Sequence, residues 1–467
     1  MHIFPKRMRF VMTRRLFAVL VCAMIVSNSA FAGDNPQYTQ DDQDRGSAKR
    51  ESTTPDALTH PKSEGGLTLE AAIARALTQS PKIRSSDAAR QSSQGELRQA
   101  GVWQNPELEV AAENIAGKGQ YKGFDSAEVT YGVSQLVEIG GKRDARIEMA
   151  KRGVDLANYD HQAAKLDLIQ DVTQAFVEAV ATSEEVRQAR EQQVLANDVL
   201  QSVSRRVEAA REPLIQKSKA NVALATSRIA LEKAERDHDA ALKVLANLIG
   251  VDDSGAVAKL DTSGFYTISS PATMAAVKEM LERNPDVTRW KSAVAKSEAA
   301  FELERANAIP DPRINAGVRD FRESNNRAFL VGISIPIPVL NGNRGNITKA
   351  RAEVTKASVD QRVSELALNS ELTKNLQAQK TAYVQATTLK DVILPEAEHA
   401  FDLSRQGYQA GKFGYLEVLD AQRTLADARL QYIEALKEFH IQRSNVERLT
   451  ATHLPTKNAL EEPHDQE

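Results

Sequence analysis

Two carboxylates lie three residues apart in the stretch AGKFGYLEVLDAQ (410–422), at Glu417 and Asp420. Residues three apart on an α-helix share one face, so this pair would place two negative charges one turn apart. Such a pair attracts cations, but it is equally compatible with simple solvation on an exposed helix. The two residues alone therefore indicate an electrostatic site and leave its role open.

Metal-binding and catalytic chemistry have little support. The eight histidines never fall three or four residues apart, the spacing that a helical metal site needs. The single cysteine, Cys22, lies in an N-terminal apolar run, and the methionines after that run are Met149, Met274 and Met280. A dedicated soft-metal site is not expected, and His161, on an apolar helix face, is favoured as a packing residue. We expect no bound metal, no cofactor and no enzymatic activity.

The N-terminus predicts export. Five basic residues precede the apolar run LFAVLVCAMIV (16–26), and AFA (30–32) provides an A-x-A cleavage site. This pattern is typical of a secretory signal peptide over residues 1–32, because the run is too short to span a membrane. Lipidation of Cys22 is disfavoured, since Val21 rather than a small residue precedes it. Cleavage would take the formal net charge from −3 to −8, a charge balance that disfavours nucleic acid as a partner.

The rest of the chain contains an internal duplication. SPKIRS at 80 corresponds to NPDVTR at 284, NPELEV at 105 to DPRINA at 311, and GGKR at 140 to NGNR at 341. The order is kept, which indicates two copies of one unit. We place them at 67–250 and 272–452, joined by a linker at 251–271. The polar segments 33–66 and 453–467 are expected to be disordered.

Each unit is predicted to contain a helix, two strands, a long helix, a turn and a shorter helix. Aromatic residues make up only 5% of the chain, which favours extended helices packed side by side over a large globular core. Apolar residues recur at helical spacing over about 68–102, 142–211, 214–249, 272–308, 343–409 and 414–450. The helix at 142–211 would be about 100 Å long, so it must lie in a coiled-coil-like wall. Pro395 should kink the helix at 343–409 or shift its register.

The strands alternate apolar and polar residues, as at 106–113 and 126–137. Strands of this length can cross an outer membrane at a tilt, but a closed barrel needs about eight strands and one chain supplies four. A membrane location therefore requires an oligomer that shares one barrel. Four residues would then turn the chain sharply where the barrel meets the helices: Gly140, Gly141, Asn341 and Gly342. The neighbouring basic residues Lys142, Arg143 and Arg344 would reach lipid headgroups.

The duplicated unit resembles the TolC family of outer-membrane efflux proteins over roughly residues 67–452. The stretches VSQLVEIGGKRDARIEMAK and GYQAGKFGYLEVLDAQRTLADAR are most similar to its cobalt–zinc–cadmium (CzcC-like) branch. The resemblance implies a mainly α fold with a small β part. It implies a homotrimer with a shared twelve-strand β-barrel in outer-membrane lipid and a twelve-helix α-barrel in the periplasm. It also implies two partners, a periplasmic adaptor and an inner-membrane resistance–nodulation–division pump.

The resemblance also implies roles for particular residues. Glu417 and Asp420 match acidic positions that line the closed pore constriction in the family. Phe413 stands where the family has a basic residue, which puts a salt-bridge latch at that position in doubt. The two helix–helix turns are the expected adaptor-docking tips, through Ala210, Arg211, Gly411, Lys412, Phe413 and Gly414.

The sequence therefore favours the outer-membrane channel of a tripartite efflux system, exporting divalent heavy-metal cations such as cobalt, zinc, cadmium or nickel. One alternative keeps the fold but changes the cargo, to drugs or to proteins secreted by a type I system. Another alternative, from a different class, is a soluble periplasmic coiled-coil scaffold whose apparent strands are loops.

Overall fold

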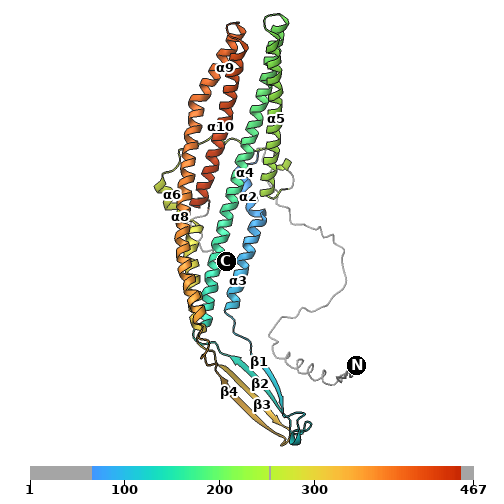
Figure 1. Cartoon of the computed structure of the whole chain (residues 1–467), viewed down its shortest axis with the longest axis vertical. Helices are drawn as coiled ribbons and strands as arrows, with labels where there is room; N and C mark the ends of the chain where they lie inside the picture. The colour runs from blue at the N-terminus through green and yellow to red at the C-terminus, as the bar shows by residue number, and fades with distance from the viewer. Residues whose placement is uncertain (1–65, 252–253, 454–467) are drawn as a thin grey trace, which may run out of the picture. The chain divides into compact units, whose positions relative to one another are not determined.

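The computed structural model describes residues 66–251 and 254–453. The predicted signal peptide with Cys22, nearly all of the polar segment 33–66, and the tail after His453 lie outside the described residues. The described residues belong to one compact unit, and the fold below is that of this unit (Figure 1).

The order of elements confirms the duplicated unit. The first copy contains α2 (Leu69–Gln79), α3 (Pro81–Ala100), β1 (Glu107–Glu113), β2 (Glu128–Leu136), α4 (Lys142–Glu208) and α5 (Leu214–Leu248), with a 3-10 turn η1 (Gly119–Tyr121) between the strands. The second contains α6 (Met274–Leu281), α7 (Pro285–Asn307), β3 (Arg313–Phe321), β4 (Asn326–Ser334), α8 (Arg344–Thr388), a π turn η3 (Leu389–Ile393), α9 (Leu394–Gln409) and α10 (Tyr415–Thr450). A short 3-10 helix, η2 (Ser254–Val257), lies between the copies.

The first helix of each copy is broken, whereas the sequence analysis expected it to be continuous. Ser80 separates α2 from α3, and its hydroxyl accepts a hydrogen bond from the Lys82 N–H at 3.2 Å. Asn284 begins α7 in the same way, accepting from the Asp286 N–H at 2.7 Å. A proline follows each capping residue. Proline disfavours helical backbone at the preceding residue and favours the first position of a new helix, so Ser-Pro and Asn-Pro restart the helix.

The expected disturbance near Pro395 is confirmed as a change of helical register. The π turn at Leu389–Ile393 comes immediately before α9, whose first turn contains Pro395. A proline ring collides with the carbonyl four residues earlier and offers no N–H to it. The wider π turn inserts one extra residue and accommodates this mismatch.

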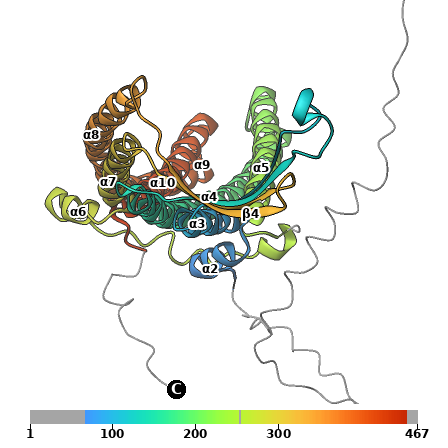
Figure 2. The same ribbon diagram turned by 90° about the horizontal axis from the view of Figure 1, so that it is seen from below.

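The helices form a wall. Contacts connect α5 to α4, α4 to α10, and α10 to α8, and Figure 2 shows α5 and α8 at opposite ends of this curved row. The 67 residues of α4 span about 100 Å. The largest apolar cluster lies midway along α4, around Val172 and Val180 of this helix. Ala72 of α2, Leu245 of α5, Leu436 of α10 and Phe265 of the linker belong to the same cluster.

The four strands form one antiparallel sheet in the order β1-β2-β3-β4. Val110 lies opposite Tyr131, Tyr131 opposite Val318, and Val318 opposite Phe329. The outer strands β1 and β4 are therefore the two free edges of the sheet within the chain. Among the described residues, no helix combines the length and apolar character needed to cross a membrane.

Candidate functional site

The two faces of the sheet differ in chemistry. One face exposes apolar side chains from all four strands: Leu108, Val110, Tyr131, Val133, Ile314, Phe329, Val331 and Ile333. The other face is crossed by ion pairs, because Arg313 contacts Glu107 at 2.5 Å and Arg319 contacts both Glu113 and Glu128 at 3.0 Å. The sheet is thus suited to separate a nonpolar medium from water.

The first strand-to-helix junction links β2 to α4 and is tightly closed. Gly140 and Gly141 have φ values of 74° and 77°, a left-handed conformation that glycine adopts without strain. Lys142 follows, and it is buried. Its Nζ lies 2.7 Å from Asp311 Oδ1 and donates to the Ile309 carbonyl at 2.5 Å. The expectation that Lys142 reaches lipid headgroups is therefore wrong, because its ammonium group is held inside the protein.

Two arginines of the same junction cap the preceding helix. Arg143 Nε donates to the Gly101 carbonyl, and Arg146 Nε donates to the Ala100 carbonyl, both at 2.9 Å. Arg146 also pairs with Glu138 at 2.7 Å, and this pairing raises the pKa of the guanidinium. Cations at the C-terminal end of α3 satisfy its free carbonyls and complement the helix dipole.

The second junction links β4 to α8 and uses a different residue from the expected one. Asn343 adopts the left-handed conformation, with φ 58°, whereas Gly342 does not have a positive φ. The Asn343 side-chain amide donates to the Glu304 carbonyl at 2.8 Å and to the Glu304 carboxylate at 2.7 Å. Asn341 accepts a hydrogen bond from the Asn343 N–H at 3.1 Å. The sharp turn thus lies one residue beyond the Asn341-Gly342 pair, and Arg344 is exposed.

The two helix–helix turns lie at the far end of the helices from the sheet (Figure 1). Ala210 and Gly411 occupy corresponding left-handed positions, with φ 50° and 71°. Arg211, Lys412 and Gly414 are exposed. Phe413 is half-exposed, and one side of its ring packs on Gly407, where a Cβ atom would come within 2.1 Å of Phe413 Cδ2. The second turn therefore presents a fixed aromatic ring, which the first turn does not have.

Arg206 joins the two turns and was missed by the sequence analysis. Its guanidinium donates to the Tyr408 carbonyl at 2.7 Å and lies 4.3 Å from the centre of the Tyr408 ring. Burial raises the pKa of the Tyr408 hydroxyl. Arg206 belongs to α4 and Tyr408 to α9, so the contact ties the ends of the two hairpins. No signal in the sequence could have indicated this contact, because charged residues are frequent along α4 and Arg205 stands beside Arg206.

Glu417 and Asp420 are both exposed on α10, close in sequence to the second turn. Tyr415 and Val418 are buried, so the carboxylates and the packed residues lie on different faces of the helix. Glu417 belongs to the first turn of α10, where the helix dipole favours a negative charge. The structure thus places the two carboxylates near Lys412 and Phe413, while Ala210 and Arg211 belong to the other hairpin.

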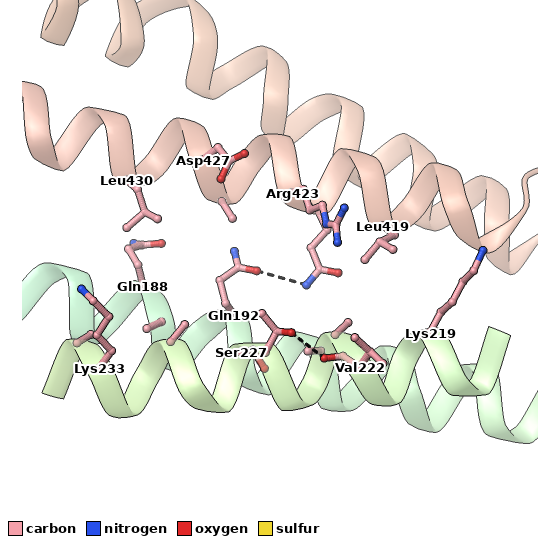
Figure 3. Close-up of a pocket in the computed structure, with 18 of the residues that line it drawn as sticks. Gln188, Gln192, Lys219, Val222, Ser227, Lys233, Leu419, Arg423, Asp427 and Leu430 are labelled. Atoms are coloured by element: carbon pink, nitrogen blue, oxygen red, sulfur yellow. Dashed lines mark hydrogen bonds between the residues drawn. The ribbon is translucent and has the colours of Figure 1, made fainter. Parts of the chain in front are cut away.

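A groove of about 860 Å³ separates the two hairpins near these turns (Figure 3). Its walls come from α4, α5 and α10, and Gln422 on α10 donates to Gln192 on α4 at 3.3 Å. Charged residues of both signs line it, among them Lys219, Arg423 and Asp427. The groove shows that α5 and α10 are not packed against each other along this stretch.

Among residues 66–251 and 254–453, no group of three or more His, Cys, Asp or Glu side chains is arranged to hold a metal ion. His161 Nδ1 lies 2.8 Å from the Ser86 hydroxyl. Burial lowers the pKa of this imidazole, as expected for a neutral packing residue.

Comparison with known proteins identifies the family. The model of the family described as "Outer membrane efflux protein" matches residues 72–251 and 276–452. The chain belongs to this outer membrane efflux protein family. The resemblance to the TolC-type efflux proteins and to their heavy-metal branch is thereby confirmed.

Among its relatives in this family, the cobalt-zinc-cadmium resistance protein CzcC of Cupriavidus metallidurans is 30% identical, over 82% of this chain and 90% of CzcC. The nickel-cobalt-cadmium resistance protein NccC of Alcaligenes xylosoxydans is 28% identical, over 56% of this chain and 58% of NccC. The crystal structure of the outer membrane protein VceC of Vibrio cholerae has the same fold, with a TM-score of 0.69 at 19% identity, over 82% of this chain and 95% of VceC.

Proposed function

We propose that this outer membrane efflux protein is the trimeric exit channel of a tripartite system that exports divalent heavy-metal cations across the outer membrane. The observation that carries the proposal is the four-stranded sheet, with one apolar face, one ion-paired face and two free edges. An open edge is not tolerated in lipid, because its N–H and C=O groups have no partner there. Three copies would join β4 of each to β1 of the next and close a barrel.

The position of the apolar band supports a membrane-spanning sheet. Val110 and Phe329 lie in one row of the sheet. Within the strands the exposed apolar residues all lie on this one face, from Leu108 on β1 to Ile333 on β4. Strands that cross a membrane at a tilt of about 45° turn such a face toward lipid.

The helices support a passive conduit. The curved wall of α5, α4, α10 and α8 would form one third of an α-barrel in the periplasm, continuous with the β-barrel at the sheet end of the helices. The exposed pair Glu417 and Asp420 would then form two rings of three carboxylates at the far end of the tube. Negative rings in a narrow passage favour cations and repel anions. The catalytic chemistry of export belongs to other components in this proposal.

The names of the relatives support the proposed cargo. CzcC and NccC are named for resistance to cobalt, zinc, cadmium and nickel, so we assign divalent ions of this kind to the channel. A periplasmic adaptor would dock on the exposed turns around Ala210 and Arg211 and around Gly411 to Gly414. An inner-membrane pump of the resistance–nodulation–division type would load the tube.

The proposal is tested by deletion and complementation in the source bacterium. Loss of the chain should lower resistance to cobalt, zinc, cadmium or nickel, and the wild-type chain should restore it. Light scattering of the purified protein in detergent should give a trimer. If the deletion left metal resistance unchanged and increased drug sensitivity, the cargo would be drugs instead of metal ions. A monodisperse monomer would contradict the shared barrel.

A further inference from the structure

Exposed apolar side chains gather on the two connectors that flank the sheet edges. In the connector from β4 to α8, Ile337 is 82% exposed, Val339 80% and Leu340 100%. In the connector from α3 to β1, Val102 and Trp103 are at least half-exposed. Large contiguous apolar surfaces of this kind mark contacts with another molecule or with lipid.

The connectors of the inner strands are better covered. Ile139, after β2, and Ile309, before β3, are 41% and 43% exposed. Lys142 and Asp311 close this region with their buried ion pair, and the Val137 N–H donates to the Pro312 carbonyl at 2.9 Å. Exposure is therefore greatest at the two edges of the sheet and smaller at its centre.

The strand directions bring the two edge connectors together in an assembly. β4 runs toward the helices and β1 runs away from them, because neighbouring strands are antiparallel throughout the sheet. A second copy that places its β1 beside β4 continues this alternation, at the usual strand spacing of about 4.8 Å. The segment after β4 and the segment before β1 of the second copy then leave the sheet at the same end.

Trp103 is already oriented within its own chain. The Arg143 guanidinium lies 5.5 Å from the centre of the indole ring, and Arg143 is itself fixed by the Gly101 carbonyl. The indole nevertheless remains 55% exposed. A pre-oriented aromatic side chain loses little conformational entropy when a partner covers it, which is typical of residues that dominate an interface.

The β4 side offers a matching apolar surface. A hollow of about 520 Å³ lies beside the connector, and its lining includes Ile309, Pro310, Pro336, Ile337, Pro338 and Leu340. Lys142 also lines it, but its ammonium group is paired with Asp311. Pro336 and Pro338 have no N–H to donate, which disfavours continued strand pairing along the connector and favours contact through side chains.

We propose that Trp103 and Val102 of one copy pack against Ile337, Val339 and Leu340 of the next copy, and that this contact fastens the trimer where the sheet meets the helices. The inference rests on the trimer of the proposed function and adds the residues that hold neighbouring copies together at this level. The proposed partner of this apolar surface is a second copy of this chain. The test must distinguish that partner from lipid.

Disulfide cross-linking tests the contact. In a Cys22→Ser background, Trp103→Cys is combined with Leu340→Cys in one double variant, and Val102→Cys with Val339→Cys in another. Mild oxidation of membranes should convert the monomer band on a denaturing gel into covalent dimers and trimers, and reductant should reverse this. Single-cysteine variants and the distant pair Trp103→Cys with Phe413→Cys should remain monomeric on the gel.

Tryptophan fluorescence distinguishes burial of this surface by a second copy from contact with lipid. In a Trp290→Phe variant, Trp103 is the remaining tryptophan, and brominated lipids should quench its emission only weakly. A native trimer by light scattering, with strong quenching and no cross-link from either pair, would assign the surface to lipid and overturn the inference. Absence of a native trimer would overturn the proposed function as well.

Discussion

The two strand-to-helix junctions occupy corresponding places in the duplicated unit but are stabilised differently. The first is closed by residues of its own chain, through Lys142, Asp311 and the capping arginine Arg146. The second has an asparagine turn at Asn343, beside a connector with apolar side chains exposed. The difference follows position in the sheet, because β2 is an inner strand and β4 an edge strand. The two copies of the unit thus share the same order of elements, but the contacts at each junction differ with the strand that it follows.

The helix–helix turns extend this comparison to the far end of the unit, where only the second turn carries an aromatic ring. Replacing Lys412 and Phe413 together with Asp should abolish metal efflux, because the proposed adaptor surface would lose its cation and its exposed ring. The change Ala210→Asp with Arg211→Asp at the first turn should reduce efflux less. Metal resistance and cross-linking to the adaptor measure both, with trimer content as the control. Equal effects of the two changes would remove the distinction between the turns.

The largest effect on stability is expected at the first junction. Lys142→Ala should lower the free energy of unfolding by about 3–5 kcal/mol, because it leaves the partly buried Asp311 carboxylate without its cation. Arg344→Ala, at an exposed basic residue of the second junction, should change it by less than about 0.5 kcal/mol. Denaturant midpoints in detergent provide the comparison. The double variant Lys142→Met with Asp311→Leu removes both charges and should recover part of the loss. Failure to recover any would show that the hydrogen bonds of this pair to the Ile309 carbonyl and the Ile139 N–H dominate.

Gly140 and Gly342, one from each junction, should respond to alanine in opposite ways. Gly140→Ala forces an alanine into φ 74° and places its Cβ 2.7 Å from Ile309 Cδ1, so a loss of about 1–3 kcal/mol is expected. Gly342→Ala meets no atom within 4 Å and needs no positive φ. This second change should be neutral or stabilising by up to about 1 kcal/mol. Thermal unfolding of both variants decides the point, and a destabilised Gly342→Ala would show that the second junction is as constrained as the first.

The smallest contrast concerns the residue that turns the second junction. Asn343→Ala should cost about 1–2 kcal/mol, because alanine is strained at φ 58° and loses the hydrogen bonds to Glu304. Asn343→Gly removes the same hydrogen bonds without the strain, so it should cost less. The unfolding midpoints of the two variants distinguish the cost of backbone strain from the cost of the lost hydrogen bonds. Identical losses would mean that the hydrogen bonds alone stabilise this turn.

Much of this fold could be predicted from the sequence, because its main features are periodic. Apolar residues at helical spacing indicated the long α4, alternation indicated the four strands, and the count of strands indicated an oligomer. The breaks before Pro81 and Pro285 were also readable, since a capping residue precedes each proline. They were missed because the apolar pattern continues across both breaks.

The contacts that define the site were harder to predict from the sequence. Lys142 and Asp311 are far apart in the sequence, and no local pattern shows that a lysine after two glycines is buried. The contact between Arg206 and Tyr408 likewise joins two hairpins. The roles of Glu417, Asp420 and the exposed turns stay predictions, because they depend on copies and partners outside this chain.

Pro336 and Pro338 have a consequence for the newly made chain, before it meets its neighbours. A single copy has an unpaired β4 edge with a strongly apolar extension, and such edges promote aggregation through unwanted strand pairing. The two prolines remove N–H donors along that extension and limit how far a foreign strand can align with it. The segment can thus remain apolar enough for its final surroundings while resisting misassembly in transit.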